Sequence, residues 1–190
     1  MNIIGNQFKV MTWGESHGLG LGGVIDGCPA GLLIDEYFIM DRLKMDVPDS
    51  KLGTGRKEPN PIIILSGINS SNITLGTPLS FFIPNLDYNS KCYEDMETPI
   101  RPGHGDFTYQ TKFGIADIRG GGRASGRECI ARVAAGAIAE QLIHVVFPEI
   151  EIKAHVTAMA GVKINTPHDY IIAQDKAKKL PLWETPAAEK

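Results

Sequence analysis

The sequence SGRECIARVAAGAIAEQLIHVVF, residues 125–147, predicts the long helix that organises the fold. Its first four residues, Ser125-Gly126-Arg127-Glu128, fit a capping box, in which the Ser and Glu side chains satisfy backbone N–H groups at a helix start. Pro148 then ends the helix, because proline lacks the backbone N–H and clashes with the preceding turn. Ala and Ile lie on almost every side of the segment, which predicts a helix buried all round by other layers.

Short apolar segments on both sides of this helix predict strands. They are rich in Val, Ile and Phe, are bounded by Gly, Pro or Asn, and cover residues 7–12, 22–28, 62–68, 79–83 and 150–159. The last one alternates apolar with polar residues, which indicates a strand with one solvated face. A second helix is predicted over residues 35–44, with Asp35 as its N-cap. Phe38, Ile39 and Leu43 share one face of it. Strands before and after a buried helix predict an α+β fold with a helix layer between sheets.

Composition narrows the class of protein. The 190 residues are 43% hydrophobic, which is enough for one domain, or for one domain and a fragment. The formal net charge of −3 argues against a general binder of nucleic acids or anionic membranes. Cys28, Cys92 and Cys129 are odd in number and lack metal-ligand spacing, so we expect reduced thiols in a cytoplasmic protein. No secretory signal is visible, and no apolar stretch is expected to reach the roughly 20 residues of a membrane span.

The first motif that carries chemistry is Trp13-Gly14-Glu15-Ser16-His17-Gly18. Glycines leave the backbone around three short polar residues bare. A His on such a loop beside a carboxylate is a candidate general acid or base, so His17 is a candidate catalytic residue. The alternative is a His that caps a turn.

The second motif is Arg101-Pro102-Gly103-His104-Gly105-Asp106, on a turn stiffened by Pro and Gly. Arg would hold the oxygens of an anion, and His104 would supply or take a proton. The alternative is an ion-paired surface turn.

The third motif, residues 119–128, is RGGGRASGRE at the start of the predicted long helix. Bare amides at a helix N-terminus form an anion site, and residues 101–132 carry a local charge of +3. The pattern is not a Walker-type nucleotide site, because Arg127 and Glu128 replace the Lys and the Ser or Thr. A disordered RGG-type RNA segment is improbable, because the tract occurs once and precedes an apolar helix. No His or Cys spacing predicts a metal site.

The three motifs in this order, with Val24-Ile25-Asp26-Gly27-Cys28-Pro29 after the first, closely resemble the chorismate synthase family. The resemblance runs from about Gly5 to the last residue. It implies a β-α-β sandwich with a helix layer between antiparallel sheets. It also implies a lyase that converts 5-enolpyruvylshikimate 3-phosphate to chorismate by 1,4-elimination of phosphate. Further implications are reduced FMN as cofactor without net redox change, and a cytoplasmic homotetramer without nucleic-acid or membrane partners.

Carried over residue by residue, the resemblance implies that His17 protonates the departing phosphate and His104 protonates the reduced flavin. Arg123, Ala124 and Ser125 would contact FMN. Substrate would be held by Lys44, Lys51, Arg56 and Arg127. The flavin would be reduced by an intrinsic NADP-dependent activity or by a separate protein.

Two departures from the family pattern matter. Where the family carries an arginine cluster after the first helix, residues 41–48 read DRLKMDVP, with Asp46 near the expected positive charge. Lys44 could take the place of one of these arginines, but lysine lacks the bidentate fork of arginine. We therefore predict weakened substrate binding. Family members also continue well beyond this length. We therefore expect residues 1–190 to form the N-terminal part of one chorismate synthase domain. The alternative function is an inactive truncated remnant that binds flavin or substrate weakly without turnover.

Overall fold

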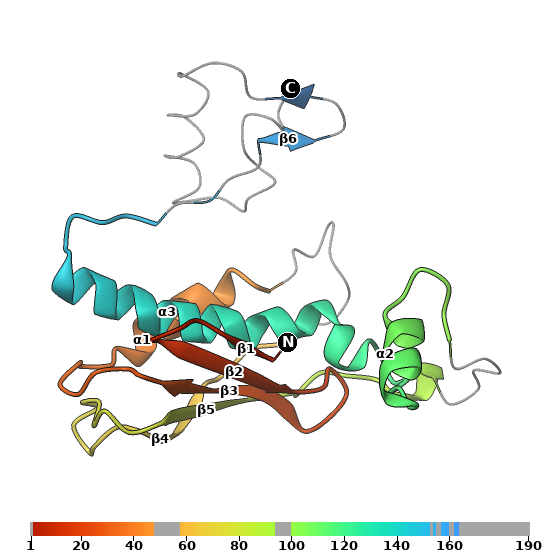
Figure 1. The fold of residues 1–190 in the computed structure, drawn as a ribbon, viewed down its shortest axis with the longest axis horizontal. Helices are drawn as coiled ribbons and strands as arrows, with labels where there is room; N and C mark the ends of the chain where they lie inside the picture. Colours follow the sequence, from red (N-terminus) through yellow and green to blue (C-terminus); the bar gives the residue numbers. More distant parts are fainter. Residues whose placement is uncertain are drawn as a thin grey trace. The chain divides into compact units, whose positions relative to one another are not determined.

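The computed structural model describes residues 2–47, 58–93, 100–152, 154, 157–159 and 162–163. The chain forms two compact units, Met1–Val146 and Phe147–Lys190. In the first unit, a five-stranded antiparallel sheet carries two helices, α1 and α3, on one face (Figure 1). The α+β class is confirmed.

The sheet has the strand order β1-β2-β3-β5-β4. Its strands are β1 (Ile3–Ile4), β2 (Lys9–Gly14), β3 (Gly20–Asp26), β4 (Ile63–Ser66) and β5 (Leu79–Pro84). Four of the five predicted strands are thus confirmed, with ends displaced by one or two residues in most cases. The short β1, which pairs Ile3 with Met11, was not predicted.

The core lies between the sheet and the helices. Leu21 and Ile25 of β3 and Phe81 of β5 are fully buried. Gly23 faces Phe81 across the sheet, and a Cβ on Gly23 would lie 2.6 Å from Cζ of Phe81. The missing side chain therefore lets the Phe81 ring lie flat over β3. Truncation of a buried Phe to Ala costs about 3–5 kcal/mol, so this ring is a main contributor to core stability.

Helix α1 (Glu36–Lys44) begins as predicted. The Asp35 carboxylate accepts hydrogen bonds from the backbone N–H groups of Tyr37 and Phe38, and Ile39 and Leu43 are buried. These bonds satisfy N–H groups that have no partner within the helix. The sequence prediction for this helix is confirmed.

Helix α3 (Cys129–Val146) buries one face, not all sides. Ile130, Ala134 and Ile138 are fully buried, whereas Val145 is 70% exposed. The prediction of burial all round is therefore wrong for the first unit. Within its described residues, one sheet and α1 cover the helix, and no second sheet packs on its other side.

The expectation that no stretch is long and apolar enough to span a membrane is also wrong. Residues Gly126–Val146 meet that criterion by length and composition. Core helices meet the same criterion, and a third of this segment's most apolar window is buried against the rest of the chain. The finding is weak support for a membrane span.

In the second unit, β6 (Ala158–Met159) pairs with β7 (Val162–Lys163) in an antiparallel arrangement. The strand predicted over residues 150–159 is wrong at its start. Ile150 and Ile152 lie in no strand and are 42% and 62% exposed. Residues 153, 155 and 156 of that prediction lie outside the described residues.

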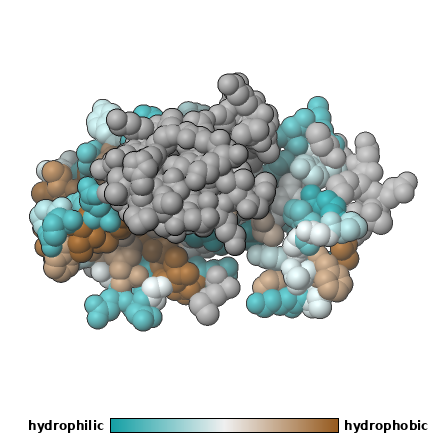
Figure 2. Space-filling view, turned by 90° about the horizontal axis from the view of Figure 1, so that it is seen from above, coloured by the Kyte–Doolittle hydropathy of each residue, from teal (hydrophilic) through white to brown (hydrophobic). Residues whose placement is uncertain are grey.

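Four short helical elements complete the described part of the first unit, and three of them lie in the second and third motifs. They are the 3₁₀ turns η1 (Lys91–Tyr93), η2 (Gly122–Ala124) and η3 (Gly126–Glu128), and the helix α2 (Asp106–Phe113), which was not predicted. Helix α2 leaves Phe107 and Phe113 exposed. Figure 2 shows hydrophobic surface at this end of the first unit.

Of the predicted thiols, Cys28 is buried, Cys129 is half-buried, and both are free. Burial raises the pKa of the Cys28 thiol, which makes it less reactive than an exposed one. The side chain of Cys92 lies outside the described part of the chain.

Candidate active site

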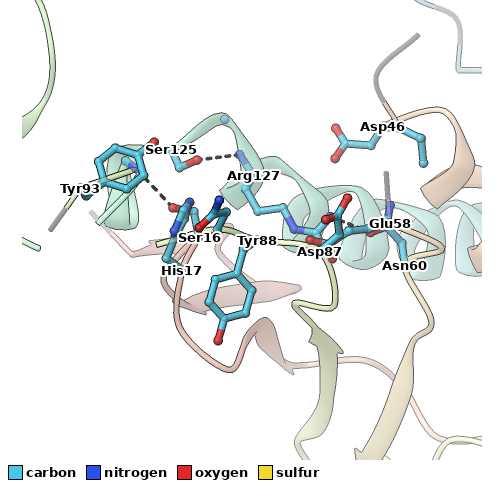
Figure 3. A pocket seen from close by; sticks show the side chains of 15 residues that line it. Ser16, His17, Asp46, Glu58, Asn60, Asp87, Tyr88, Tyr93, Ser125 and Arg127 are labelled. Carbon is cyan, nitrogen blue, oxygen red and sulfur yellow. Dashed lines mark hydrogen bonds and ion pairs between the residues drawn. The ribbon is translucent and has the colours of Figure 1, made fainter. Parts of the chain in front are cut away.

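A cavity of about 640 Å³ lies beside the N-terminal end of α3 (Figure 3). Its volume is within the range of small-molecule sites, about 300–1,000 Å³. It is lined by Ser16, His17, Asp46, Val47, Glu58, Asn60, Asp87, Tyr88, Asn89, Tyr93, Gly120, Gly121, Ser125, Gly126 and Arg127. The structure therefore brings the first and third motifs into one cavity.

Backbone contacts join these two motifs. The Ser16 N–H donates to the Gly122 carbonyl at 3.3 Å, and the Gly121 N–H donates to Ser16 Oγ at 3.3 Å. Gly120 has a φ of +61°, and a Cβ there would lie 2.4 Å from Cδ2 of His17. The absent side chain of Gly120 thus leaves the space that the His17 ring occupies.

The His17 ring is fixed by residues distant in sequence. Its Nδ1 lies 3.1 Å from Ser90 Oγ. The rings of Tyr88 and Tyr93 meet it edge-on, with centroid distances of 5.5 and 5.2 Å. The His17 ring is thus held in the cavity by a residue 73 positions away in the sequence. This contact favours His17 as a site residue over the alternative, a His that caps its own turn.

The second motif forms a compact ion-pair cluster. Arg101 donates from Nε to Asp106 Oδ2 at 2.7 Å and from Nη2 to Oδ1 at 2.9 Å. These bonds hold the pKa of the Asp106 carboxyl down at about 2. Asp106 Oδ1 also lies 2.8 Å from Nδ1 of His104. The ion-paired turn is therefore the correct interpretation for Arg101, whose fork is occupied by Asp106.

His104 lies outside the lining of the large cavity but is connected to it. Arg101 Nη2 donates to the Gly120 carbonyl at 2.6 Å, and the Arg101 guanidinium lies 5.6 Å from the Tyr93 ring centroid. Gly120 and Tyr93 both touch His17. Arg101 is thus the residue through which the three motifs meet.

The predicted substrate residue Arg127 lies in the cavity wall with most of its side chain buried (Figure 3). Its guanidinium donates to Glu58 at 2.7 Å, to Asn60 at 2.6 Å and to Asn85 at 3.2 Å. Its backbone N–H donates to Ser125 Oγ at 3.2 Å. These three bonds fix the position of the Arg127 guanidinium in the cavity wall.

The predicted capping box is only half correct. Ser125 caps the turn through the Arg127 N–H, but the Glu128 side chain does not return to Ser125. Glu128 accepts instead from Thr12 Oγ1 at 2.6 Å and from Arg123 at 3.3 Å. The long-range partner replaces the local one because Glu128 is buried against β2, where Thr12 is the available donor.

The predicted FMN residues lie at two adjoining hollows. Ser125 lines the large cavity, whereas Arg123 and Ala124 line a smaller one of about 120 Å³ together with Gly105 and Asp106. The Arg123 guanidinium donates to backbone and side-chain oxygens of β2, so these donor groups are engaged within the protein. Contact with a flavin through these three residues would therefore rest on backbone groups and on Ser125.

Of the substrate residues predicted between positions 44 and 56, the structure describes only Lys44. Lys44 is exposed on α1, 3.8 Å from Asp41, and does not line the cavity. Lys51 and Arg56 lie outside the described residues. Asp46 does line the cavity, and burial raises the pKa of its carboxyl.

Sequence reasoning missed the residues that hold the motifs. They are Glu58, Asn60, Asn85, Tyr88, Ser90 and Tyr93. The available signal was the polar sequence NLDYNS after β5, residues 85–90, which follows a buried strand directly. Loops at strand ends are where sites gather, and this one was not singled out.

Three comparisons with known proteins agree. The family model described as chorismate synthase matches residues 8–188. The chorismate synthase of Nitratidesulfovibrio vulgaris (strain Miyazaki F) is 47% identical over 165 residues, covering 85% of this chain and 46% of that protein. The one from Roseobacter denitrificans is 43% identical over 190 residues, covering 100% of this chain and 50% of that protein.

A crystal structure of chorismate synthase matches with a TM-score of 0.69 and 26% identity, covering 97% of this chain and 50% of that one. The chain spans about half the length of the curated relatives it matches. The family match covers nearly the whole chain, and the relatives share the same name. The chain belongs to the chorismate synthase family.

Proposed function

We propose that this chain supplies the N-terminal part of a chorismate synthase domain, which converts 5-enolpyruvylshikimate 3-phosphate to chorismate and phosphate. The observation that supports this most is the meeting of the three motifs. His17 and Arg127 line one cavity, and Arg101 connects the turn of His104 to Gly120 at its wall.

The residues present are compatible with a flavin. The cavity combines two tyrosine rings, bare glycine amides and Ser125, which suit a planar aromatic ring with polar edges. Arg123, Ala124 and Ser125 would hold FMN through backbone groups and the Ser125 hydroxyl. When bound, reduced FMN supplies an electron to the substrate and recovers it, without net redox change.

The chain's own residues then have separate tasks. The elimination breaks a C–O bond to phosphate and removes a proton from carbon, so the leaving phosphate requires a proton. His17 would supply it from its ring, which Ser90 and two tyrosines hold in place. Arg127 would orient the anionic substrate from the cavity wall with its positive charge. His104 would hold a proton for the cofactor.

The test is turnover by the purified 190-residue chain with reduced FMN and 5-enolpyruvylshikimate 3-phosphate under anaerobic conditions. Chorismate release and flavin absorbance are followed together, with the Roseobacter denitrificans relative as positive control and His17→Ala as negative control. Turnover that His17→Ala abolishes would support the proposal. A folded chain that neither turns over nor binds either compound would contradict it.

The second candidate is a non-catalytic form that binds flavin or substrate weakly. One observation favours it: the cavity contains Asp46 where an anionic substrate needs positive charge. Binding without turnover by the folded chain would support this candidate. If turnover appears when the chain is mixed with the other half of the Roseobacter denitrificans protein, the result would support the first proposal, an enzyme, over the non-catalytic form. A cytoplasmic homotetramer remains part of the first proposal.

A further inference from the structure

Helix α2 is anchored by a carboxylate and not by apolar packing. Asp106 is the buried residue of this helix, with 3% of its side chain exposed, while Phe107 and Phe113 are 61% and 60% exposed. A buried carboxylate is costly unless donors surround it. Its position therefore requires an explanation in terms of the groups it contacts.

Four donors or potential donors reach the two oxygens of Asp106. Oδ2 accepts from the Arg101 backbone N–H at 3.2 Å and from Arg101 Nε at 2.7 Å. Oδ1 accepts from Arg101 Nη2 at 2.9 Å and lies 2.8 Å from His104 Nδ1. An ionised carboxylate only accepts, so the proton between Oδ1 and Nδ1 belongs to the His104 ring. The low pKa of Asp106 keeps it ionised throughout the neutral range.

We propose that Asp106 is a positioning residue that holds neutral His104 in the tautomer with its proton on Nδ1. Nε2 is then the atom of His104 that takes up and releases a proton. Among the described residues, Nε2 has no hydrogen-bond partner. The inference deepens the proposed function and rests on it for its catalytic meaning, but the tautomer itself is a property of this chain.

The substitution Asp106→Asn should reverse the tautomer. An Asn NH₂ at the Oδ2 position would face two donors from Arg101, whereas at the Oδ1 position it would face one. The amide oxygen therefore takes the Oδ2 position. Its NH₂ group then points at His104 Nδ1, which must become an acceptor, so the ring proton moves to Nε2. Arg101 Nη2 keeps its bond to the Gly120 carbonyl.

The matched control is Asp117→Asn. Asp117 forms the same kind of fork with Arg119, which donates its backbone N–H and Nε to Oδ1 at 3.0 Å and Nη2 to Oδ2 at 3.1 Å. No histidine hydrogen bond to Asp117 is present in the described residues. The control therefore removes an equivalent charge without changing a partner of the His104 ring.

The experiment records ¹⁵N ring spectra of the histidine-labelled chain at alkaline pH, where neutral imidazole dominates. The His104 signals are assigned by their loss in His104→Gln. We expect the Nδ1–H form to exceed the Nε2–H form by about tenfold or more, because a charge-assisted hydrogen bond holds it. Asp106→Asn should invert this ratio, and Asp117→Asn should leave it unchanged.

The wild-type ratio alone can overturn the proposal, so it stays testable if Asp106→Asn fails to fold. A dominant Nε2–H form in the wild type would refute it, as would a folded Asp106→Asn variant that keeps the Nδ1–H form. The readout needs no cofactor and no turnover. An inactive chain with the expected tautomers would therefore contradict the proposed function and leave this inference intact.

Discussion

Breaking the buried pair of Glu58 and Arg127 should destabilise the fold far more than breaking the half-buried pair of Glu140 and Arg42. The two pairs have the same chemistry and the same shortest N–O distance, 2.7 Å. They differ in burial: Glu58 and Arg127 are 3% and 10% exposed, against 15% for Glu140 and 36% for Arg42. The perturbation is Glu58→Gln, which removes the charge and keeps the shape, with Glu140→Gln as the matched control.

Removing one partner of a buried pair leaves the other charge desolvated, which costs about 3–5 kcal/mol. The Leu86 N–H and Arg127 Nη2 both donate to the same oxygen, Glu58 Oε2, so a glutamine carbonyl oxygen placed there keeps both hydrogen bonds. Only the charge is lost, so we expect the lower end of that range, about 3 kcal/mol, for Glu58→Gln. Glu140→Gln should cost about 0.5–1 kcal/mol, because solvent screens the half-exposed Arg42. The first loss is a large fraction of a typical domain's stability of about 5–15 kcal/mol.

The assay is urea unfolding of both variants followed by circular dichroism, with the free energy of unfolding extrapolated to water. Equal losses within about 0.5 kcal/mol would refute the reasoning, since burial would then not decide the value of the pair. Inorganic phosphate gives a second readout. It should raise the urea midpoint of Glu58→Gln more than that of the wild type, because the cavity beside Arg127 then carries one negative charge fewer.

Three further outcomes are expected. Gly120→Ala places a methyl group 2.4 Å from His17 at a φ of +61°, so it should cost about 1–2 kcal/mol in urea unfolding and shift the His17 ring signals in NMR spectra. Asp46→Asn removes a negative charge from the cavity, and calorimetric titration with inorganic phosphate should show affinity about fivefold higher, or about 1 kcal/mol. Arg101 lowers the pKa of Asp106 from 3.8 to about 2, so the stability it contributes is present above pH 3.8 and lost as the pH falls towards 2. The urea midpoint of Asp106→Asn should accordingly fall less over that range than that of the wild type.

The elements that sequence predicted well are those determined by local chemistry. Asp35 caps α1 through N–H groups two and three residues away, and Phe81 lies in a strand that its own apolar residues predicted. Glu128 shows where this fails. Its residue type and spacing suit a capping box, but its partner Thr12 lies 116 residues away in sequence. A local sequence pattern cannot show that a distant donor such as Thr12 will compete with the local backbone N–H for the Glu128 carboxylate.

The candidate site divides in the same way. His17 and His104 were predicted because Gly-rich and Pro-rich loops make polar residues stand out. Tyr93 and Ser90 were missed because their role is to contact His17, which lies in another loop. The sequence around each residue carries no sign of that contact. The burial of α3 was overestimated because composition shows that a helix is apolar, while the number of layers that cover it depends on the rest of the fold.

The charge of the second and third motifs also has a different meaning in the folded chain. Four motif arginines suggested free positive charge for an anion, but each is paired with a carboxylate of the chain. The pairs are Arg101 with Asp106, Arg119 with Asp117, Arg123 with Glu128, and Arg127 with Glu58. A paired guanidinium adds little net charge to the cavity. Arginine here fixes the geometry of the loops, and we expect recognition of an anion in the described cavity to depend on directed donor groups more than on excess charge.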